Sequence, residues 1–214
     1  MSLPMNTESH CYVCGKTSEQ MTLLSTNQFG SPDLDLRPPE MARSTMGYWI
    51  QECPYCGYVA KELSDETVIT KDWLSSNTYI SCDNRKFIHR LAELFYRHYL
   101  ISVENNDNKS AFYAALHSAW VCDDAYDVDN AIFCRKKALL ELEKMIVNDS
   151  QNETLLLMRA DLLRRSGQFE LLIKEYENKK FSEKLFNEIA MFQIRKAKQK
   201  DTHCYRIADV QIKK

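Results

Sequence analysis

Four of the eight cysteines form two pairs with the same spacing, and a glycine follows each pair directly. The two motifs are Cys11-Tyr-Val-Cys14-Gly15 and Cys53-Pro-Tyr-Cys56-Gly57. Two intervening residues let both thiolates of a pair reach one metal ion from a tight turn, here called a knuckle. A glycine at the end of such a turn takes the positive φ angle that other residues rarely adopt. Two knuckles supply four thiolates, which predicts a closed tetrahedral shell with no position left for a substrate water.

The predicted metal site is therefore structural, and its ligands are Cys11, Cys14, Cys53 and Cys56. We expect one Zn²⁺ ion, because a tetrahedron of sulfur ligands suits zinc. Iron stays open as the alternative, since both motifs also resemble the knuckles of rubredoxin, a small protein that carries one electron on a single iron ion. The colour of the purified protein separates the two, because the iron form is red and the zinc form is colourless.

Dithiol redox chemistry is a further alternative, because Cys53-Pro-Tyr-Cys56 matches the motif of the glutaredoxins letter for letter. In that fold the motif opens a helix, and a cis-proline later in the chain contacts the substrate. No proline follows Pro54 in this chain. Gly57 also suits a knuckle better than the first turn of a helix. Glutaredoxin-like catalysis would leave Cys11 and Cys14 unexplained, so we do not expect it.

Proline and glycine are concentrated in the first third of the 214-residue chain, where all five prolines and four of the five glycines lie. Proline breaks helices and glycine weakens them, so this part must be rich in turns and the remainder can be almost unbroken helix. The sequence therefore predicts an α+β fold, mostly α, with two domains. The first is a small antiparallel zinc-ribbon domain, residues 1–65, and the second is a helical domain, residues 66–214.

The predicted zinc ribbon needs strands that lead into its knuckles. Residues 21–29 have strand-like composition, and residues 47–52 are expected to run as a strand into the second knuckle. Such a small domain cannot bury enough apolar surface to fold alone. The metal ion would therefore contribute directly to its stability.

A long loop, residues 29–40, lies between the two knuckles. Three of its charged residues, Asp33, Asp35 and Arg37, alternate with leucines, so in an extended chain they share one face. One hypothesis is a partner-binding loop, because long loops in compact domains are often functional. The other is that Arg37 pairs with a neighbouring carboxylate and holds the loop onto the ribbon, which is the more common use of such charges.

From residue 83 onward, apolar residues recur at the spacing of amphipathic helices. Each apolar stripe is one-sided, so each helix must pack against another. Cys134 and Cys204 lie on these stripes and Cys122 lies near one, so we expect all three to be buried as small apolar residues. The histidines share no spacing that predicts a second metal site. Breaks between helices are expected at residues 104–109, 123–127, 148–152, near 167, at 178–182 and near 201.

Residues 162–170 resemble the turn inside a tetratricopeptide repeat, in which one helix ends at a glycine and an aromatic residue starts its partner. From Gly167 to the next expected break at Asp201 is 34 residues, the period of that family. The preceding pair, residues 110–147, departs from the pattern because its turn is acidic and has no glycine. Helix pairs stacked in this way leave a concave face, which usually holds an extended peptide or a partner's helix.

Composition and missing motifs exclude several classes of function. The net charge of −2 gives no general attraction to nucleic acids. No apolar run is long enough to cross a bilayer, and residues 1–10 lack the features of a secretory signal. Eight cysteines without an export signal indicate the reducing cytoplasm. No phosphate-binding loop, serine elbow or zinc-protease motif occurs, so we do not expect an enzyme.

The order of the motifs is similar to that in a bacterial family of uncharacterised zinc-ribbon proteins known as DUF2225. The similarity lies in Cys-x-x-Cys-Gly near the start, a strand into Cys-Pro-Tyr-Cys-Gly-Tyr-Val-Ala, and tetratricopeptide-like helices after it. It implies a cytoplasmic bacterial protein in which the four cysteines of the knuckles hold one metal ion. It implies no particular activity, since that family has none established.

The leading hypothesis is a non-enzymatic zinc-binding module that docks a protein or peptide partner on its helical face, with no membrane partner. The first alternative is a rubredoxin-like electron carrier. The second is a zinc ribbon that binds nucleic acid, but residues 1–65 carry four lysines and arginines against eight acids, and this charge of −4 opposes it. Aromatic residues near the knuckles could stack on bases, although such residues more often pack a ribbon onto helices. These are Tyr12, Tyr48, Trp49, Tyr55 and Tyr58.

Overall fold

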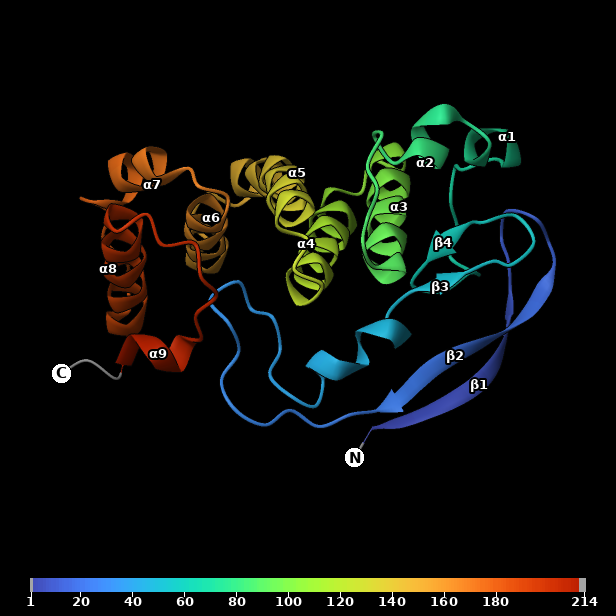
Figure 1. Ribbon diagram of the computed structural model, residues 1–214, viewed down its shortest axis with the longest axis horizontal. Coiled ribbons are helices and arrows are strands. Elements are labelled where there is room, and N and C mark those ends of the chain that lie inside the picture. Colours follow the sequence, from blue (N-terminus) through green and yellow to red (C-terminus); the bar gives the residue numbers. More distant parts are fainter. Residues whose placement is uncertain (1, 212–214) are drawn as a thin grey trace.

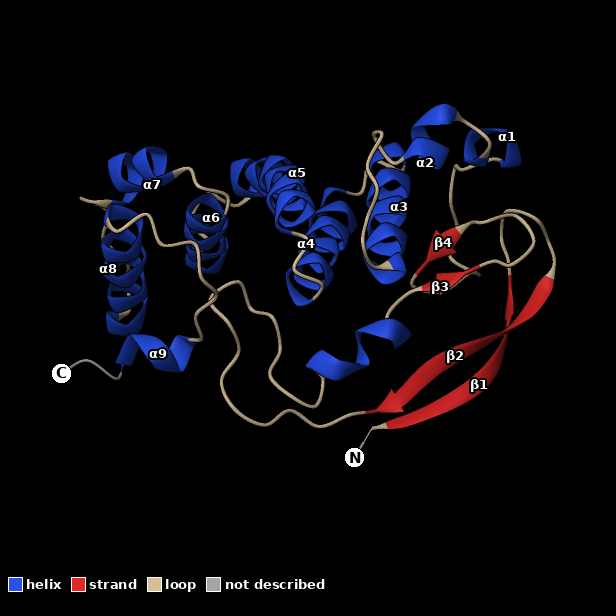
Figure 2. Ribbon diagram, in the orientation of Figure 1, coloured by secondary structure: helices blue, strands red, loops and turns tan. Residues whose placement is uncertain are grey.

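A computed structural model of the chain describes residues 2–211 (Figure 1). Two β-hairpins form the N-terminal part, and a row of helices forms the rest (Figure 2). The observed fold is α+β and mostly α, as the sequence predicts. In the described part of the chain, every helix is too short or too polar to cross a membrane.

Each hairpin consists of two antiparallel strands joined by one of the knuckles. His10 pairs with Thr17 at the end of the first hairpin, and Glu52 pairs with Val59 at the end of the second. Both knuckles therefore sit at hairpin tips, which is the arrangement of a zinc ribbon. The strands are β1 (Leu3–His10), β2 (Thr17–Ser25), β3 (Gln51–Glu52) and β4 (Val59–Ala60).

The strands differ in extent from the predicted ones. Strand β2 begins and ends four residues earlier than the expected 21–29. The expected strand 47–52 is wrong for most of its length, because the 3-10 helix η1 (Arg43–Tyr48) precedes a two-residue strand. In η1 the hydroxyl of Thr45 donates to the carbonyl of Ala42 at 2.7 Å, and the indole N–H of Trp49 donates to Thr45 at 3.1 Å. These local hydrogen bonds stabilise a turn in place of the extended chain.

The long helices after residue 83 end and begin at the predicted breaks or within three residues of them. Two short helices, α1 (Lys71–Leu74) and α2 (Asn77–Ser81), precede them and were not expected; the hydroxyls of Thr70 and Ser76 cap their N-termini. The first long helix begins at Arg90, so Phe87 lies outside it. The remaining helices are α3 (Arg90–Glu104), α4 (Asn108–Asp124), α5 (Val128–Asn148), α6 (Glu153–Arg165), α7 (Phe169–Tyr176), α8 (Lys184–Lys198) and α9 (Ile207–Gln211).

The ends of α3, α4, α6 and α8 share one backbone geometry. At each end, one residue with positive φ is followed by a residue whose N–H donates to the carbonyl five positions back, at 2.8–3.0 Å. This pattern satisfies carbonyls that the end of a helix leaves unpaired. Only one of the four positive-φ positions is a glycine, so the sequence pattern revealed only that one. They are Asn106, Tyr126, Gly167 and Lys200.

The apolar core is continuous from the ribbon into the helices. One cluster of buried residues contains Val59 and Leu63 of the ribbon together with Phe95 and other residues of α3 to α8. At the junction, the ring of His117 in α4 lies 5.2 Å from that of Trp49 and 5.1 Å from that of Phe95. The ribbon is therefore held against α3 and α4 by packed side chains.

Candidate metal centre

The four knuckle cysteines converge on one point. Their sulfur atoms all lie within 4.8 Å of one another, with Cys11 and Cys56 3.7 Å apart and Cys14 and Cys53 3.6 Å apart. Metal–sulfur bonds of about 2.3 Å give a sulfur–sulfur edge of about 3.8 Å in a regular tetrahedron. All four thiols are free. The group therefore has the size and the donor atoms to hold one metal ion.

The two knuckles have the same backbone structure. In the first, the N–H of Cys11 donates to the carbonyl of Lys16 at 2.9 Å, and the N–H of Gly15 donates to the carbonyl of Cys11 at 2.8 Å. The second knuckle repeats both bonds at 2.8 and 2.9 Å. Gly15 and Gly57 have φ angles of +72° and +73°, and a Cβ on either would meet no atom within 4 Å. Glycine is required here by the backbone angle and not by crowding.

Burial opposes the ionisation of Cys11, Cys14 and Cys56. Burial raises the pKa of Cys11 and of Cys56. Burial also opposes ionisation of Cys14, but the backbone N–H of Lys16 and the neighbouring thiols lower the pKa of Cys14 to about 7. Adjacent thiolates repel one another, and a bound cation removes that repulsion. The arrangement therefore favours a cation at its centre.

Further contacts fix the knuckles to the rest of the chain. The N–H of Tyr12 donates to the carbonyl of Leu63 at 2.8 Å, and the hydroxyl of Tyr79 in α2 donates to the carbonyl of Gly57. Cys11 and Cys53 are buried, whereas Cys14 and Cys56 are half-buried. The cluster is thus anchored on its inner side and approaches the surface on the other.

The aromatic residues near the knuckles divide into two sets. Tyr58 is buried, and Trp49 packs against His117, so both join the ribbon to the helical core. Tyr12 and Tyr55 are about half exposed. The ammonium group of Lys16 lies 4.6 Å from the centre of the Tyr55 ring. These two tyrosines are the ones that remain accessible beside the metal centre.

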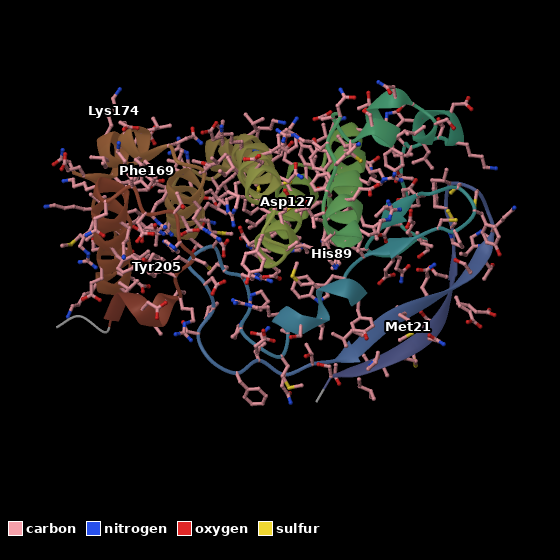
Figure 3. All side chains as sticks on the ribbon, viewed as in Figure 1. Met21, His89, Asp127, Phe169, Lys174 and Tyr205 are labelled. Carbon is pink, nitrogen blue, oxygen red and sulfur yellow. The ribbon has the colours of Figure 1, made fainter. Side chains whose placement is uncertain are left out.

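The loop of residues 29–40, here called the strap, crosses from the ribbon to the C-terminal helices (Figure 1). Its backbone bonds to the segment before α9, with the N–H of Leu34 donating to Tyr205 at 2.8 Å and the N–H of Ile207 donating to Pro32 at 2.9 Å. Tyr205 lies next to α8 (Figure 3). The strap therefore joins the ribbon to the C-terminal segment of the chain.

Asp33, Asp35 and Arg37 of the strap turn inward, whereas Glu40 at its end is exposed. Asp35 has no exposed surface, accepts the indole N–H of Trp120 at 2.7 Å and pairs with Arg165 at 3.2 Å. Arg37 pairs with Asp124 of α4. Arg37 is therefore paired inside the molecule, but its partner is Asp124 of α4 and not a neighbouring carboxylate, so this pair holds the loop to the helices and not onto the ribbon.

Asp33, the third of these residues, is also buried, and it pairs with Arg43 at 2.6 Å. None of the three side chains is available to a partner that approaches from solvent in this conformation.

A buried ionic network extends from the strap into the helices. Arg165 of α6 contacts both Asp35 and Asp123, and Asp123 also pairs with Arg135 of α5. Burial raises the pKa of Asp35 against the attraction of Arg165, while Arg135 and Arg165 overcome burial and lower the pKa of Asp123. The acidic residues at 123–127 are the part of this network that stands out in the sequence. Their spacing alone does not predict that Arg135 and Arg165 pair with Asp123.

The remaining cysteines are only partly as predicted. Cys122 and Cys134 are fully buried in the core, as expected. The prediction for Cys204 is wrong, because this residue is exposed and lies in the segment before α9 and not on a helix. Its thiol donates to the carboxylate of Asp33 at 3.2 Å. Cys82 is a buried free thiol at the end of α2.

His98 is buried and His117 is half-buried near the junction of the ribbon and the helices. Burial lowers the pKa of His98 to about 4 and that of His117 to about 3. Neither ring nitrogen of His98 has a hydrogen-bond partner. Among residues 2–211, the four knuckle cysteines are the one group of three or more potential ligands close enough to share a metal ion.

Comparisons of the chain with family models, with curated proteins and with solved structures each gave no match. The family resemblance described above therefore remains an expectation from the sequence.

Proposed function

We propose that this protein is a non-enzymatic zinc-binding module whose ribbon is fixed to a helical body that docks a protein or peptide partner. The observation that carries the proposal is the closed group of four thiols at the two hairpin tips. Four sulfur ligands complete a tetrahedral shell, so a zinc ion there would have no open position for substrate or water. Such a site stabilises a fold and performs no hydrolytic chemistry.

The helical body supports the interaction role. The positive-φ turns at Gly167 and Lys200 have the same hydrogen bonding and lie 33 residues apart, close to a tetratricopeptide period. Helix α6 contacts both α7 and α8, as stacked helix pairs do. We therefore assign the partner to the surface of this helical array, and the protein to the cytoplasm of a bacterium, where free cysteines persist.

Zinc, as opposed to iron, is tested by elemental analysis of protein expressed with both metals in the medium. We expect one zinc ion per chain and colourless protein. Cys14→Ser and Cys56→Ser should each lose the metal, whereas Cys204→Ser is the matched control, since Cys204 lies outside the cluster. A red protein with one iron ion per chain would instead support the electron-carrier alternative, which the half-exposed Cys14 and Cys56 make physically reasonable.

The interaction role is tested by affinity capture from a lysate of the source bacterium. We expect the wild-type protein to retain the same partner protein in repeated captures. An equal amount of the metal-stripped Cys53→Ser variant should not retain it. Failure of the wild-type protein to retain anything specific would contradict the role, and turnover of a substrate by the purified protein would contradict it directly.

A further inference from the structure

The outward face of α8 combines apolar and basic side chains. Met191 is 67% exposed, and Arg195 is exposed one turn further along the helix. Ile194 is half-buried beside them. Because residues four apart lie on the same face of a helix, these side chains form a continuous surface on the last long helix of the array.

Two hollows meet on this face, and Arg195 lines both. The first has a volume of about 460 Å³ and lies between α8, the segment before α9 and α9 itself, with Phe192 and Tyr205 in its wall. The second, of about 410 Å³, lies between α8 and the end of α7, with Met191 and Ile194 in its wall. Gln199 also lines both hollows. The two hollows, which share these two lining residues, are here called the α8 groove.

The charges along the α8 groove leave one cation free among the described residues. The acids that line it are already paired, since Glu177 bonds to Lys198 at 2.8 Å and Asp209 bonds to Arg206 at 3.4 Å. Lys196 is likewise held by Asp201 at 3.0 Å.

Within residues 2–211, Arg195 forms no such pair and only stacks over Phe192, 5.1 Å from the ring centre. An unpaired guanidinium beside apolar surface favours a ligand with a carboxylate next to an apolar side chain.

We propose that the α8 groove binds an acidic, apolar peptide segment of a partner protein, with a carboxylate on Arg195 and an apolar side chain over Met191. This proposal rests on the interaction role proposed above and specifies its surface. The ends of α4 and α6 are less suitable, because the strap already covers Trp120 and Arg165 there. Charge complementarity excludes a basic segment at the same place.

The test is selection of a phage-displayed random 12-residue peptide library on the full-length, metal-loaded protein. We expect enrichment of peptides with Asp or Glu beside a large apolar residue. Synthetic copies of these peptides, followed by fluorescence anisotropy, should bind the Arg195→Glu variant about tenfold or more weakly than wild type. Met191→Glu should weaken them similarly.

The matched control is Lys184→Glu, because Lys184 is on the same helix and highly exposed but lines neither hollow. Its affinity for the peptides should stay within about twofold of wild type. Equal binding to wild type and Arg195→Glu, enriched peptides without carboxylates, or no enrichment would each overturn the α8 groove. Lysate capture that is unchanged by Arg195→Glu would overturn the groove while leaving the interaction role standing.

Discussion

The carboxylate of Asp35 lies 3.2 Å from the guanidinium of Arg165, although 130 residues separate them in the chain. Both side chains are buried, and the indole of Trp120 donates a hydrogen bond to the same carboxylate. This contact joins the strap of the ribbon to α6, and Arg165 extends it to Asp123 of α4. The long loop between the knuckles is thus a structural tie between the metal-binding part and the helices.

Removal of the Asp35 carboxylate should destabilise the whole protein. Asp35→Ala removes the acceptor of the Trp120 N–H and leaves Arg165 with Asp123 as its one remaining acidic partner, and we expect the free energy of unfolding to fall by about 3 kcal/mol. Urea denaturation at pH 7 measures it. Glu66→Ala, at an exposed acid, is the control and should change stability by less than about 0.5 kcal/mol. Equal stability of the two variants would show that the strap contact is not stabilising.

His98 and His117 should make the protein acid-sensitive. Their pKa values, about 4 for His98 and about 3 for His117, lie below the value of about 6.5 in an unfolded chain. The unfolded chain therefore binds more protons below pH 6.5, and the free energy of unfolding falls as pH decreases from about 6.5 toward 4. For His98 the loss between pH 7.5 and 5.5 is about 1 kcal/mol.

Substitution of His98 checks this pH dependence. His98→Phe should reduce the slope of unfolding free energy against pH, measured by urea denaturation between pH 5.5 and 7.5, where acid has not yet displaced the metal. His203→Phe is the control, because the side chain of His203 is 84% exposed. The same slope in wild type and His98→Phe would contradict a neutral, buried His98.

The turn at Gly167 should not tolerate a side chain, although there is space for one. Its φ angle is +77°, and a Cβ would meet no atom within 4 Å. Gly167→Ala should therefore lower the free energy of unfolding by about 1 kcal/mol through backbone strain alone. Gly47→Ala is the matched control, since that glycine has equal space and no positive φ. Thermal unfolding compares them, and a larger loss at Gly47 would contradict the assignment.

The sequence predicted the parts that depend on local spacing. Two Cys-x-x-Cys-Gly motifs identify the metal ligands because the knuckle geometry lies within six residues of chain. Apolar periodicity located the long helices and their breaks for the same reason. The turns at Asn106 and Tyr126 were not recognised as equivalent to Gly167, because their residue types do not mark a positive φ.

Contacts between residues far apart in the chain could not be predicted from local spacing. The inward orientation of Asp35 depends on Trp120 and Arg165, which are 85 and 130 residues away. Alternation with leucines gives the spacing of the charges in the strap but not the side that becomes buried. The exposure of Cys204 follows likewise from the strap, which holds the segment before α9 in an extended conformation.

The most direct test of the central claim is native mass spectrometry of the purified protein combined with alkylation of its cysteines. We predict one zinc ion per chain and protection of Cys11, Cys14, Cys53 and Cys56 from iodoacetamide until a chelator removes the metal. Cys204 should react at the same slow rate in both states, because it lies outside the cluster and burial of its thiol raises its pKa to about 12. A metal-free protein whose four knuckle cysteines react at the same rate before and after the chelator is added, or are joined as disulfides, would contradict the account.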